Sequence, residues 1–370
     1  MSRIKSVVAV FAAACIAASA ACSHARRESA PAIGFSPPEG FNGVVLVARG
    51  RGEAPQVMTY GIADAEAGRS ASRTTKYQIG SASKFLTAVT MLRLADKGKI
   101  ALDAPIGTWL KDLPYKTKTS VTLRHLLTNR SGIPNGVMAV YKTDRSKVER
   151  DIPAAEASRL FGSDALTSEP GTQWDYSLTN WVLVRAIAEQ ASGLPFEQVM
   201  HEEVFAPLGI AHSGIPGMAF ELEDAAAGYA ALQPAPVRKT NRIPPYAAAS
   251  GTVYSTVDDL RALMDGVYRD GYLSPASLRE LATVAVPDQA YALGGRVIDL
   301  TEGEATKILW EPGETGAYRA VIAYEPVTGA CVVILNNTGL PADQIGDSAK
   351  RLMREALRGS QRQSGSETKS

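Results

Sequence analysis

The sequence predicts an α+β fold, an α/β sandwich in which an antiparallel sheet built from both chain ends is flanked by helices and carries an inserted, mostly helical lobe. Strand-like runs rich in β-branched residues lie near the start and again after about residue 290. Between them, apolar positions mostly recur at helical spacing. We therefore expect a single domain over 41–358, with a sheet lobe at about 41–82 and 285–358, a helical lobe at about 83–284, and a site between the lobes.

Residues 1–22 are expected to be an export signal peptide and not part of the fold. A basic start leads into an apolar run over 7–20, which is too short for a comfortable membrane span and contains an Ala-x-Ala-like cleavage site at 18–20. Cleavage just before Cys22 with lipidation of its thiol is the alternative, and it would give a membrane tether. In both cases we expect an exported protein, in the periplasm or lipid-anchored to the cell envelope.

The next elements are expected to be a linker, a β-hairpin and a helix. Residues 23–40 are rich in Ala, Pro and Ser and predict a linker. The runs at 43–49 and 56–64 are strand-like and are separated by a Gly-containing turn. Apolar residues then recur at helical spacing after Ser83, and Gly98 suits the end of that helix.

Three further helices are expected, over 120–132, 179–193 and 255–268. The first two end at a Gly, as helices often do. The third begins at a Ser/Thr pair, with Asp259 three residues after Thr256, which is typical of a capping box.

Strands return in the last part of the chain. The runs "YALGGRVIDL", "KILWEPG", "YRAVIAYEP" and "ACVVILNN" are rich in β-forming residues and have turns between them. Cys331, in the last run, is expected to be a small core residue. Residues 341–358 predict a closing helix, and the polar residues 359–370 predict a disordered tail.

Composition excludes several classes of function. The chain is 45% apolar and 21% charged, with a net charge of +1 and no long run of like charge, so no nucleic-acid partner is expected. The sequence has no P-loop, no dinucleotide fingerprint and no Gly-x-Ser-x-Gly elbow, and its four His lack metal-ligand spacing. We expect no cofactor, no metal, and a small-molecule, peptide or ester substrate.

Ser81 and Lys84 are the first candidate catalytic residues. They are one helical turn apart, so their side chains share one face of the expected helix. Free N–H groups at the helix start favour an oxyanion, and Lys84 can accept the Ser81 proton if burial lowers its pKa. Two other Ser-x-x-Lys matches lie in the signal segment and the tail, so the motif alone leaves open a capping Ser with a solvated Lys.

Three motifs occur in order: "YQIGSASK", "GKIALDAPI" and "VTLRHLLTNRSG". Together they resemble the serine β-lactamase-like family, which includes class C β-lactamases, D-alanyl-D-alanine carboxypeptidases and related esterases. The resemblance extends from about Gly43 to about Asn337. It implies a β-lactamase/transpeptidase-like fold and a Ser81 nucleophile that forms an acyl-enzyme.

The family's second motif, Tyr-x-Asn, corresponds to "YSL" in "EPGTQWDYSLTN". The resemblance implies that Tyr176 shares the proton transfer with Lys84, which requires nearby cations to stabilise its phenolate. Leu178 replaces the motif's Asn and cannot hydrogen-bond a substrate amide. Asn180 lies on a different helix face and cannot simply replace it, whereas Trp174 is a candidate to line the cleft.

The third motif, Lys/His-Thr/Ser-Gly, corresponds to "WEPGETGAYRA". This register puts Glu311 at the cation position and Pro312 at the hydroxyl position. A carboxylate there would repel a substrate carboxylate, raise the pKa of the Tyr176 phenol, and can pair with Lys84 and keep that amine protonated. Pro312 also removes one strand N–H group.

The residues that follow still match the family pattern. Gly313 and Thr315 are expected to line the substrate site. The resemblance implies that the backbone N–H groups of Ser81 and Glu314 form the oxyanion hole.

These inferences predict an exported serine hydrolase that acts through an acyl-enzyme on ester or amide substrates. Because Leu178 and Glu311 weaken recognition of carboxylate-bearing amides, an esterase or an atypical carboxypeptidase ranks above an efficient β-lactamase. The alternative is a catalytically weakened penicillin-binding-like protein that binds but turns over poorly. A third possibility is that Glu311 selects a cationic substrate.

Overall fold

The computed structural model of the protein describes residues 32–162, 165–217, 222–239, 242–269, 271–300 and 306–367. The predicted signal peptide and Cys22 lie outside these ranges. From Ile33 onward the chain belongs to one folded unit. No helix in the described ranges combines the length and the apolar character needed to cross a bilayer.

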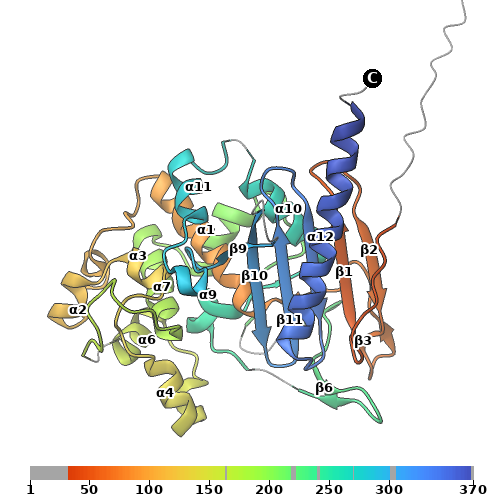
Figure 1. The fold of residues 1–370 in the computed structure, drawn as a ribbon. Helices are drawn as coiled ribbons and strands as arrows, with labels where there is room; N and C mark the ends of the chain where they lie inside the picture. Colours follow the sequence, from red (N-terminus) through yellow and green to blue (C-terminus); the bar gives the residue numbers. More distant parts are fainter. Residues whose placement is uncertain are drawn as a thin grey trace, which may run out of the picture. The chain divides into compact units, whose positions relative to one another are not determined.

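A six-stranded antiparallel sheet combines strands from both ends of the chain (Figure 1). Its order is β2-β1-β12-β11-β10-β9. The strands are β1 (Gly43–Ala48), β2 (Gln56–Tyr60), β9 (Arg296–Asp299), β10 (Lys307–Thr315), β11 (Tyr318–Tyr324) and β12 (Cys331–Asn336). The two chain ends meet where Gly43 pairs with Asn336 and Ala48 with Cys331. The predicted α+β class, with a sheet built from both ends, is confirmed.

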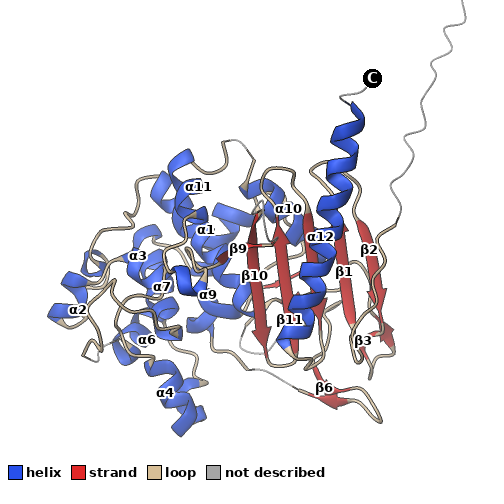
Figure 2. Cartoon of the chain, viewed as in Figure 1, coloured by secondary structure: helices blue, strands red, loops and turns tan. Residues whose placement is uncertain are grey.

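Both faces of this sheet are covered by helices (Figure 2). Val45 and Val47 belong to the apolar cluster beneath α12 (Ala342–Glu367), whereas Val44 and Leu46 belong to the cluster on the opposite face. Side chains alternate between the two faces of a strand, so a strand buried on both sides is a continuous apolar run. The buried free thiol of Cys331 lies in this core, as predicted.

The helical lobe is inserted in the sequence between the N-terminal and C-terminal strands, and most of it lies beside the β9 edge of the sheet (Figure 1). Its helices are α1 (Ser83–Asp96), α2 (Tyr115–Ser120), α3 (Leu123–Leu127), α4 (Gly136–Thr143), α5 (Arg145–Val148), α6 (Ala154–Phe161), α7 (Leu178–Ser192), α8 (Phe196–Met200), α9 (Ala248–Gly251), α10 (Val257–Val267) and α11 (Pro275–Ala282). Short strand pairs accompany them: β3 (Ile62–Asp64) with β4 (Arg69–Ser70), β5 (Tyr77–Gln78) with β8 (Tyr254–Ser255), and β6 (Tyr229–Ala231) with β7 (Val237–Arg238). The short 3₁₀ turn η1 (Gly80–Ala82) leads into α1, and η4 (Pro245–Ala247) leads into α9.

Helices α1 and α7 form the buried centre of the helical lobe. All residues from Ser83 to Leu92 in α1 and from Thr179 to Ala188 in α7 are buried. Gly193 ends α7 with a φ of 75°, a left-handed conformation that glycine adopts without steric cost, as the sequence predicts. These two rigid helices can therefore hold functional side chains in fixed positions.

Two predicted helices begin or end at the expected signals, but one is much shorter than expected. The Thr256 side chain accepts a hydrogen bond from the Asp259 N–H and caps α10. In contrast, the helix predicted over 120–132 is limited to α3, because Thr122 caps a new helix start and Asn129 has a φ of 53°. A left-handed residue interrupts the helical hydrogen-bond pattern.

The two predicted flexible segments are more ordered than expected. Residues 32–40 of the predicted linker pack on the sheet: the Ile33 N–H donates to Gln56 Oε1 at 2.9 Å, and Phe35 packs edge-on against Tyr60. Helix α12 extends to Glu367, so residues 359–367 of the predicted tail are helical. A helix forms its hydrogen bonds within its own backbone, so it can continue past the core, where composition alone predicts disorder.

Candidate active site

The turn that carries Ser81 is packed directly against strand β10. Gly80 has a φ of 53°, and a Cβ atom there would lie 2.7 Å from the backbone N, C and O atoms of Glu314. A Cβ on Gly313 would lie 1.8 Å from the carbonyl oxygen of Ile79. Glycine at both positions therefore brings the Glu314 backbone beside Ser81, where two N–H groups can face one oxyanion. Ser81 lies in η1, immediately before α1, not in the α-helix itself.

Ser81, Lys84 and Tyr176 meet in one cluster. The Ser81 Oγ accepts a hydrogen bond from the Lys84 Nζ at 3.1 Å and another from the Tyr176 hydroxyl at 2.9 Å. The Lys84 amine also donates to the backbone carbonyl of Ser250. It lies 4.9 Å from the centroid of the Tyr176 ring and 5.5 Å from that of Trp181. The structure thus brings together the three residues that the motifs single out.

The surroundings of this cluster change the acidity of two of its groups. Burial lowers the pKa of the Lys84 amine, and the nearby charge of Arg296 acts in the same direction, against the opposing effect of Tyr176. Burial alone would raise the pKa of the Tyr176 phenol. The charges of Lys84 and Arg296 and the hydrogen bond to Ser81 outweigh it and lower this pKa below its usual range. Both groups are therefore better proton acceptors near neutral pH than their free counterparts.

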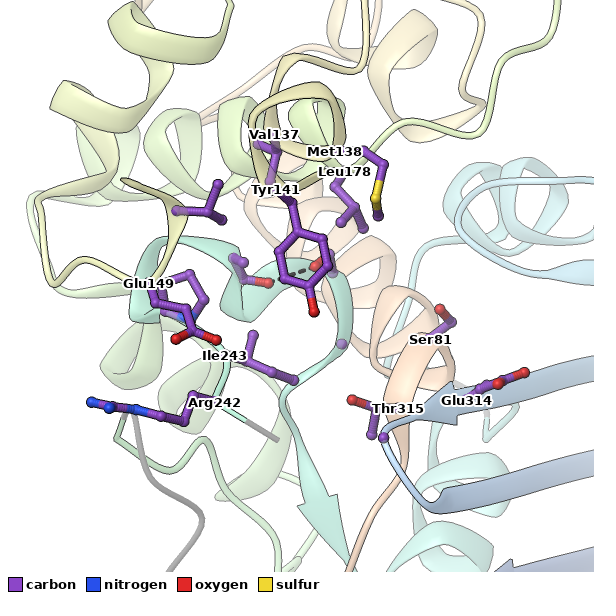
Figure 3. A pocket seen from close by; sticks show the side chains of 16 residues that line it. Ser81, Val137, Met138, Tyr141, Glu149, Leu178, Arg242, Ile243, Glu314 and Thr315 are labelled. Carbon is purple, nitrogen blue, oxygen red and sulfur yellow. Dashed lines mark hydrogen bonds between the residues drawn. The ribbon is translucent and has the colours of Figure 1, made fainter. Parts of the chain in front are cut away.

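An apolar cavity of about 280 Å³ opens on one side of Ser81 (Figure 3). Leu178, at the start of α7, forms part of its wall, and Thr315 lines its strand side. The position that carries Asn in the family's motif is thus an apolar wall here. The remaining lining residues come from α4, the end of α5, α9 and the segment before it, and the end of β10 with the turn that follows: Val137, Met138, Tyr141, Val148, Glu149, Arg242, Ile243, Pro244, Ala247, Ser250, Gly251, Glu314 and Gly316.

Asn180 does not take over the role of the missing motif Asn. It is buried, its Nδ2 donates to Asn129 Oδ1 at 3.2 Å, and its Oδ1 accepts from Ser131 at 2.7 Å. Asn129 in turn donates to the Tyr291 hydroxyl at 2.9 Å. Asn180 therefore belongs to a buried polar network beneath the site.

A second cavity, of about 250 Å³, opens on the other side of Ser81. Trp174, Tyr176 and Gly313 line it, so Trp174 lies where the sequence suggested. The Trp174 and Tyr176 rings are 6.1 Å apart. Trp310 packs beneath α12.

Glu311 is the main departure from the expected site. Its side chain is 2% exposed and lines neither of the two cavities described above. It fits against Gly295, where a Cβ atom would lie 2.1 Å from its Oε1, and its carboxyl group accepts the backbone N–H of Arg296. Burial raises its pKa well above the usual range, against the opposing charge of Arg296, and so favours its neutral form. In the described chain, no hydrogen bond or ion pair joins it to Lys84.

The expectation that Glu311 lies in the substrate site and pairs with Lys84 is therefore wrong for this structure. Glu311 shares its face of β10 with Leu309, which packs in the core beside α1. That face is closed by the segment before β9, so the carboxyl group is sealed in the interior.

Arg296 is a site residue that the sequence analysis missed. It is half-buried and lines the second cavity with Ser81 and Tyr176. Its Cα pairs with Trp310 in the β9–β10 ladder, one residue before Glu311. The family's third motif lies on β10 and carries no information about a cation on the neighbouring strand. The strand-like run "GGRVIDL" directly before β10 was the available signal, because consecutive strands usually pair.

No group of three or more His, Cys, Asp or Glu side chains in the described ranges is arranged to hold a metal ion. The side chains around the Ser81 hydroxyl are those of Lys84, Tyr176 and Arg296. A hydroxyl that accepts hydrogen bonds from an amine and a phenol is suited to acyl transfer.

The α+β fold and this cluster indicate a serine hydrolase. The chain belongs to the Beta-lactamase family, whose model matches residues 35–357. It is 36% identical over 213 residues to the esterase EstB of Burkholderia gladioli, an alignment that covers 54% of this chain and 53% of EstB. It is 28% identical over 254 residues to penicillin-binding protein 4* of Bacillus subtilis, covering 64% of this chain and 54% of that protein. The chain thus matches about half the length of these two relatives.

Solved structures show the same fold. A penicillin-binding protein from Bacillus halodurans superposes with a TM-score of 0.73 at 24% identity, covering 84% of this chain and 97% of that chain. The β-lactamase/transpeptidase-like architecture that the motifs implied is confirmed.

Proposed function

We propose that the protein is an exported serine hydrolase that cleaves esters through an acyl-enzyme on Ser81. One observation carries the proposal: the Ser81 Oγ accepts hydrogen bonds from both Lys84 and Tyr176, at 3.1 and 2.9 Å. A serine hydroxyl needs an adjacent base to become a nucleophile. The lowered pKa of the Lys84 amine, caused mainly by burial, supports this role.

The steps follow from the geometry. Ser81 Oγ attacks the substrate carbonyl carbon, and its proton passes to the Lys84–Tyr176 pair. The carbonyl oxygen gains negative charge and accepts hydrogen bonds from the Ser81 and Glu314 N–H groups. The pair then returns a proton to the leaving alcohol as the ester bond breaks. A water molecule attacks the acyl-enzyme in the same way and releases the acid.

The surroundings of Ser81 favour an ester over a peptide or a β-lactam. Leu178 offers no amide hydrogen bonds, and Pro312 lacks the N–H that other residues would present on β10. The relationship to the esterase EstB supports the same choice. The cavity of about 280 Å³ is at the small end for ligand pockets, so it suits a small apolar acyl group.

The second candidate is a weakened penicillin-binding-like protein that acylates but turns over poorly. The replacements at Leu178, Glu311 and Pro312 favour it. The isolation of Glu311 from Lys84 argues against it, because no carboxylate holds that amine in its protonated form.

Labelling with a fluorophosphonate, read by intact mass, tests the nucleophile. Wild type should gain one adduct and Ser81→Ala none, whereas the neighbouring Ser83→Ala should still be labelled, since the Ser83 hydroxyl accepts from the Val253 N–H in the interior. Labelling of Ser81→Ala would refute Ser81 as the nucleophile. Stable penicillin adducts without ester turnover would favour the binding protein.

Export is part of the proposal, and lipidation at Cys22 is the alternative form of processing, which would add a membrane tether. The mass of the mature protein from a membrane fraction tests both. An unprocessed N-terminus would contradict export, and a mature chain without an acyl group would contradict the tether.

A further inference from the structure

We propose that Arg296, on β9, is the cation of this active site, stabilising negative charge on Tyr176 during acyl transfer, and that the buried Glu311 positions it. This inference rests on the proposed function. It explains how a site whose third motif carries a carboxylate can still perform the reaction. The cation of this site lies on β9, whereas the third motif of the family carries its cation at the position of Glu311 on β10.

Among the described residues, no carboxylate forms an ion pair with the guanidinium of Arg296. Within the described ranges it has no ion pair and no side-chain hydrogen bond. Its contact is with the Tyr291 ring, 5.3 Å from the centroid, and Tyr291 packs edge-on against Tyr176 at 6.5 Å. A half-buried arginine usually has a carboxylate or carbonyl partner, because its desolvation is costly. Here it faces the cavity that also contains Ser81 and Tyr176.

The strand register explains why the charge can act from β9. Arg296 is the first residue of β9 and pairs with Trp310, and the ladder covers only 307–310 of β10. Beyond Trp310, the edge of β10 is free of β9 and faces the cavity at Pro312 and Gly313. Arg296 therefore lies at the end of the edge strand β9 that is next to the active site.

Glu311 holds the backbone of Arg296 in place without neutralising the Arg296 guanidinium. Its carboxyl group accepts the Arg296 backbone N–H, and Gly295 leaves room for it because a Cβ atom there would collide with both carboxyl oxygens. Burial raises its pKa and so favours the protonated, neutral form of this carboxyl group. A neutral acid can hold a backbone in place while leaving a nearby guanidinium fully charged.

The charged and titratable groups around Tyr176 come from several elements. Lys84 approaches from α1, Arg296 from β9, Tyr291 from the segment before β9, and Glu311 from β10. The same cavity is lined by Glu314, but that side chain forms an ion pair with Arg319 at 2.9 Å. Arg296 and Lys84 are thus the cations whose charges lower the pKa of the Tyr176 phenol.

The pH dependence of kcat/KM for a neutral p-nitrophenyl ester tests the role of Arg296. The proton acceptor must be deprotonated, so removing a nearby cation moves the acid limb to higher pH. We expect Arg296→Gln to shift this limb upward by about one unit and to lower kcat/KM at pH 7 about tenfold. Arg296→Lys should recover most of the loss. Arg159→Gln, an exposed control on α6, should match wild type.

Glu311 variants test the positioning role. Glu311→Gln should stay within about twofold of wild type, because a neutral amide oxygen also accepts the Arg296 N–H. Glu311→Ala should lower kcat/KM and shift the acid limb as Arg296→Gln does. The double variant Arg296→Gln/Glu311→Ala should be no worse than Arg296→Gln alone, since both act through one group. Additive losses would overturn the positioning role.

Two results would overturn the proposal for Arg296. One is an unchanged acid limb in Arg296→Gln. The other is a change confined to KM for carboxylate-bearing esters, which would make Arg296 a substrate-binding residue only. The rate of fluorophosphonate labelling gives the same pH profile without turnover. If wild type is never labelled at Ser81, the proposed function fails, whereas a labelled wild type with an unshifted Arg296→Gln refutes this inference alone.

Discussion

The Tyr176 hydroxyl donates a hydrogen bond to the Ser81 Oγ at 2.9 Å, although 95 residues separate the two in the sequence. Ser81 lies in the turn before α1, and Tyr176 lies two residues before the start of α7. Because α1 and α7 are both buried in the centre of the helical lobe, the two side chains meet without depending on a surface loop. A hydrogen bond between residues on rigid elements is suited to a reacting group.

Removing the Tyr176 hydroxyl should slow catalysis but leave the fold intact. We expect Tyr176→Phe to lower kcat for ester hydrolysis about 10²–10⁴-fold, the usual contribution of a positioned acid–base group. The ring contact with Trp174 remains, so the melting temperature should change little. Tyr115→Phe is the control, because Tyr115 is 79% exposed. Near-normal turnover in Tyr176→Phe would show that Lys84 carries the proton alone.

A methyl group on Gly80 should break the contact between the Ser81 turn and β10. Gly80 and Gly98 both have positive φ, 53° and 69°, so alanine at either position costs about 1–2 kcal/mol of strain. Only at Gly80 would the Cβ also collide, 2.7 Å from the Glu314 backbone. We therefore expect Gly80→Ala to lose ester turnover and more thermal stability than Gly98→Ala. Equal effects on both measurements would contradict a backbone oxyanion site here.

Leu178 should decide which acyl groups the apolar cavity accepts. We expect Leu178→Asn to lower kcat/KM about threefold to thirtyfold for butyrate esters, and less for acetate esters, because the longer chain loses more apolar contact. A p-nitrophenyl ester series measures this dependence. Leu160→Asn is the control, since Leu160 is 51% exposed on α6. The same loss for both chain lengths would place the acyl group outside the cavity of about 280 Å³.

The cluster of Ser81, Lys84 and Tyr176 follows from local motifs, and the structure brings all three together. Each lies in or beside a helix whose apolar pattern is visible in the sequence. The strands of the sheet can also be predicted from the sequence, because strands buried on both faces form continuous apolar runs.

Glu311 and Arg296 could not be placed by the same reasoning. Aligning a motif predicts which residue occupies a given position on a strand. It does not predict whether a neighbouring segment buries that residue's side chain. The segment before β9 buries the Glu311 side chain. The pairing of Arg296 with Trp310 places Arg296 next to the active site. Both effects depend on cross-strand contacts that no linear spacing encodes.

The buried Glu311 should make the stability of the protein depend on pH. Burial raises its pKa in the folded state, so the folded protein keeps a proton that the unfolded chain releases. Below about pH 4, the usual carboxyl range, both states are protonated and the full contribution to stability is present. As the pH rises above this range, the unfolded chain ionises first, and stability is lost by up to about 1.4 kcal/mol per pH unit until the folded pKa is passed.

Glutamine at position 311 has no proton to lose, so Glu311→Gln should remove this dependence. We expect its melting temperature to exceed that of wild type by a margin that widens from pH 4 to pH 8. Glu169→Gln, which alters an exposed ion pair with Lys116, should show no widening margin. A constant difference between Glu311→Gln and wild type at all pH values would mean that Glu311 is ionised in the folded protein. The guanidinium of Arg296 would then be compensated, and the site would lack its free cation.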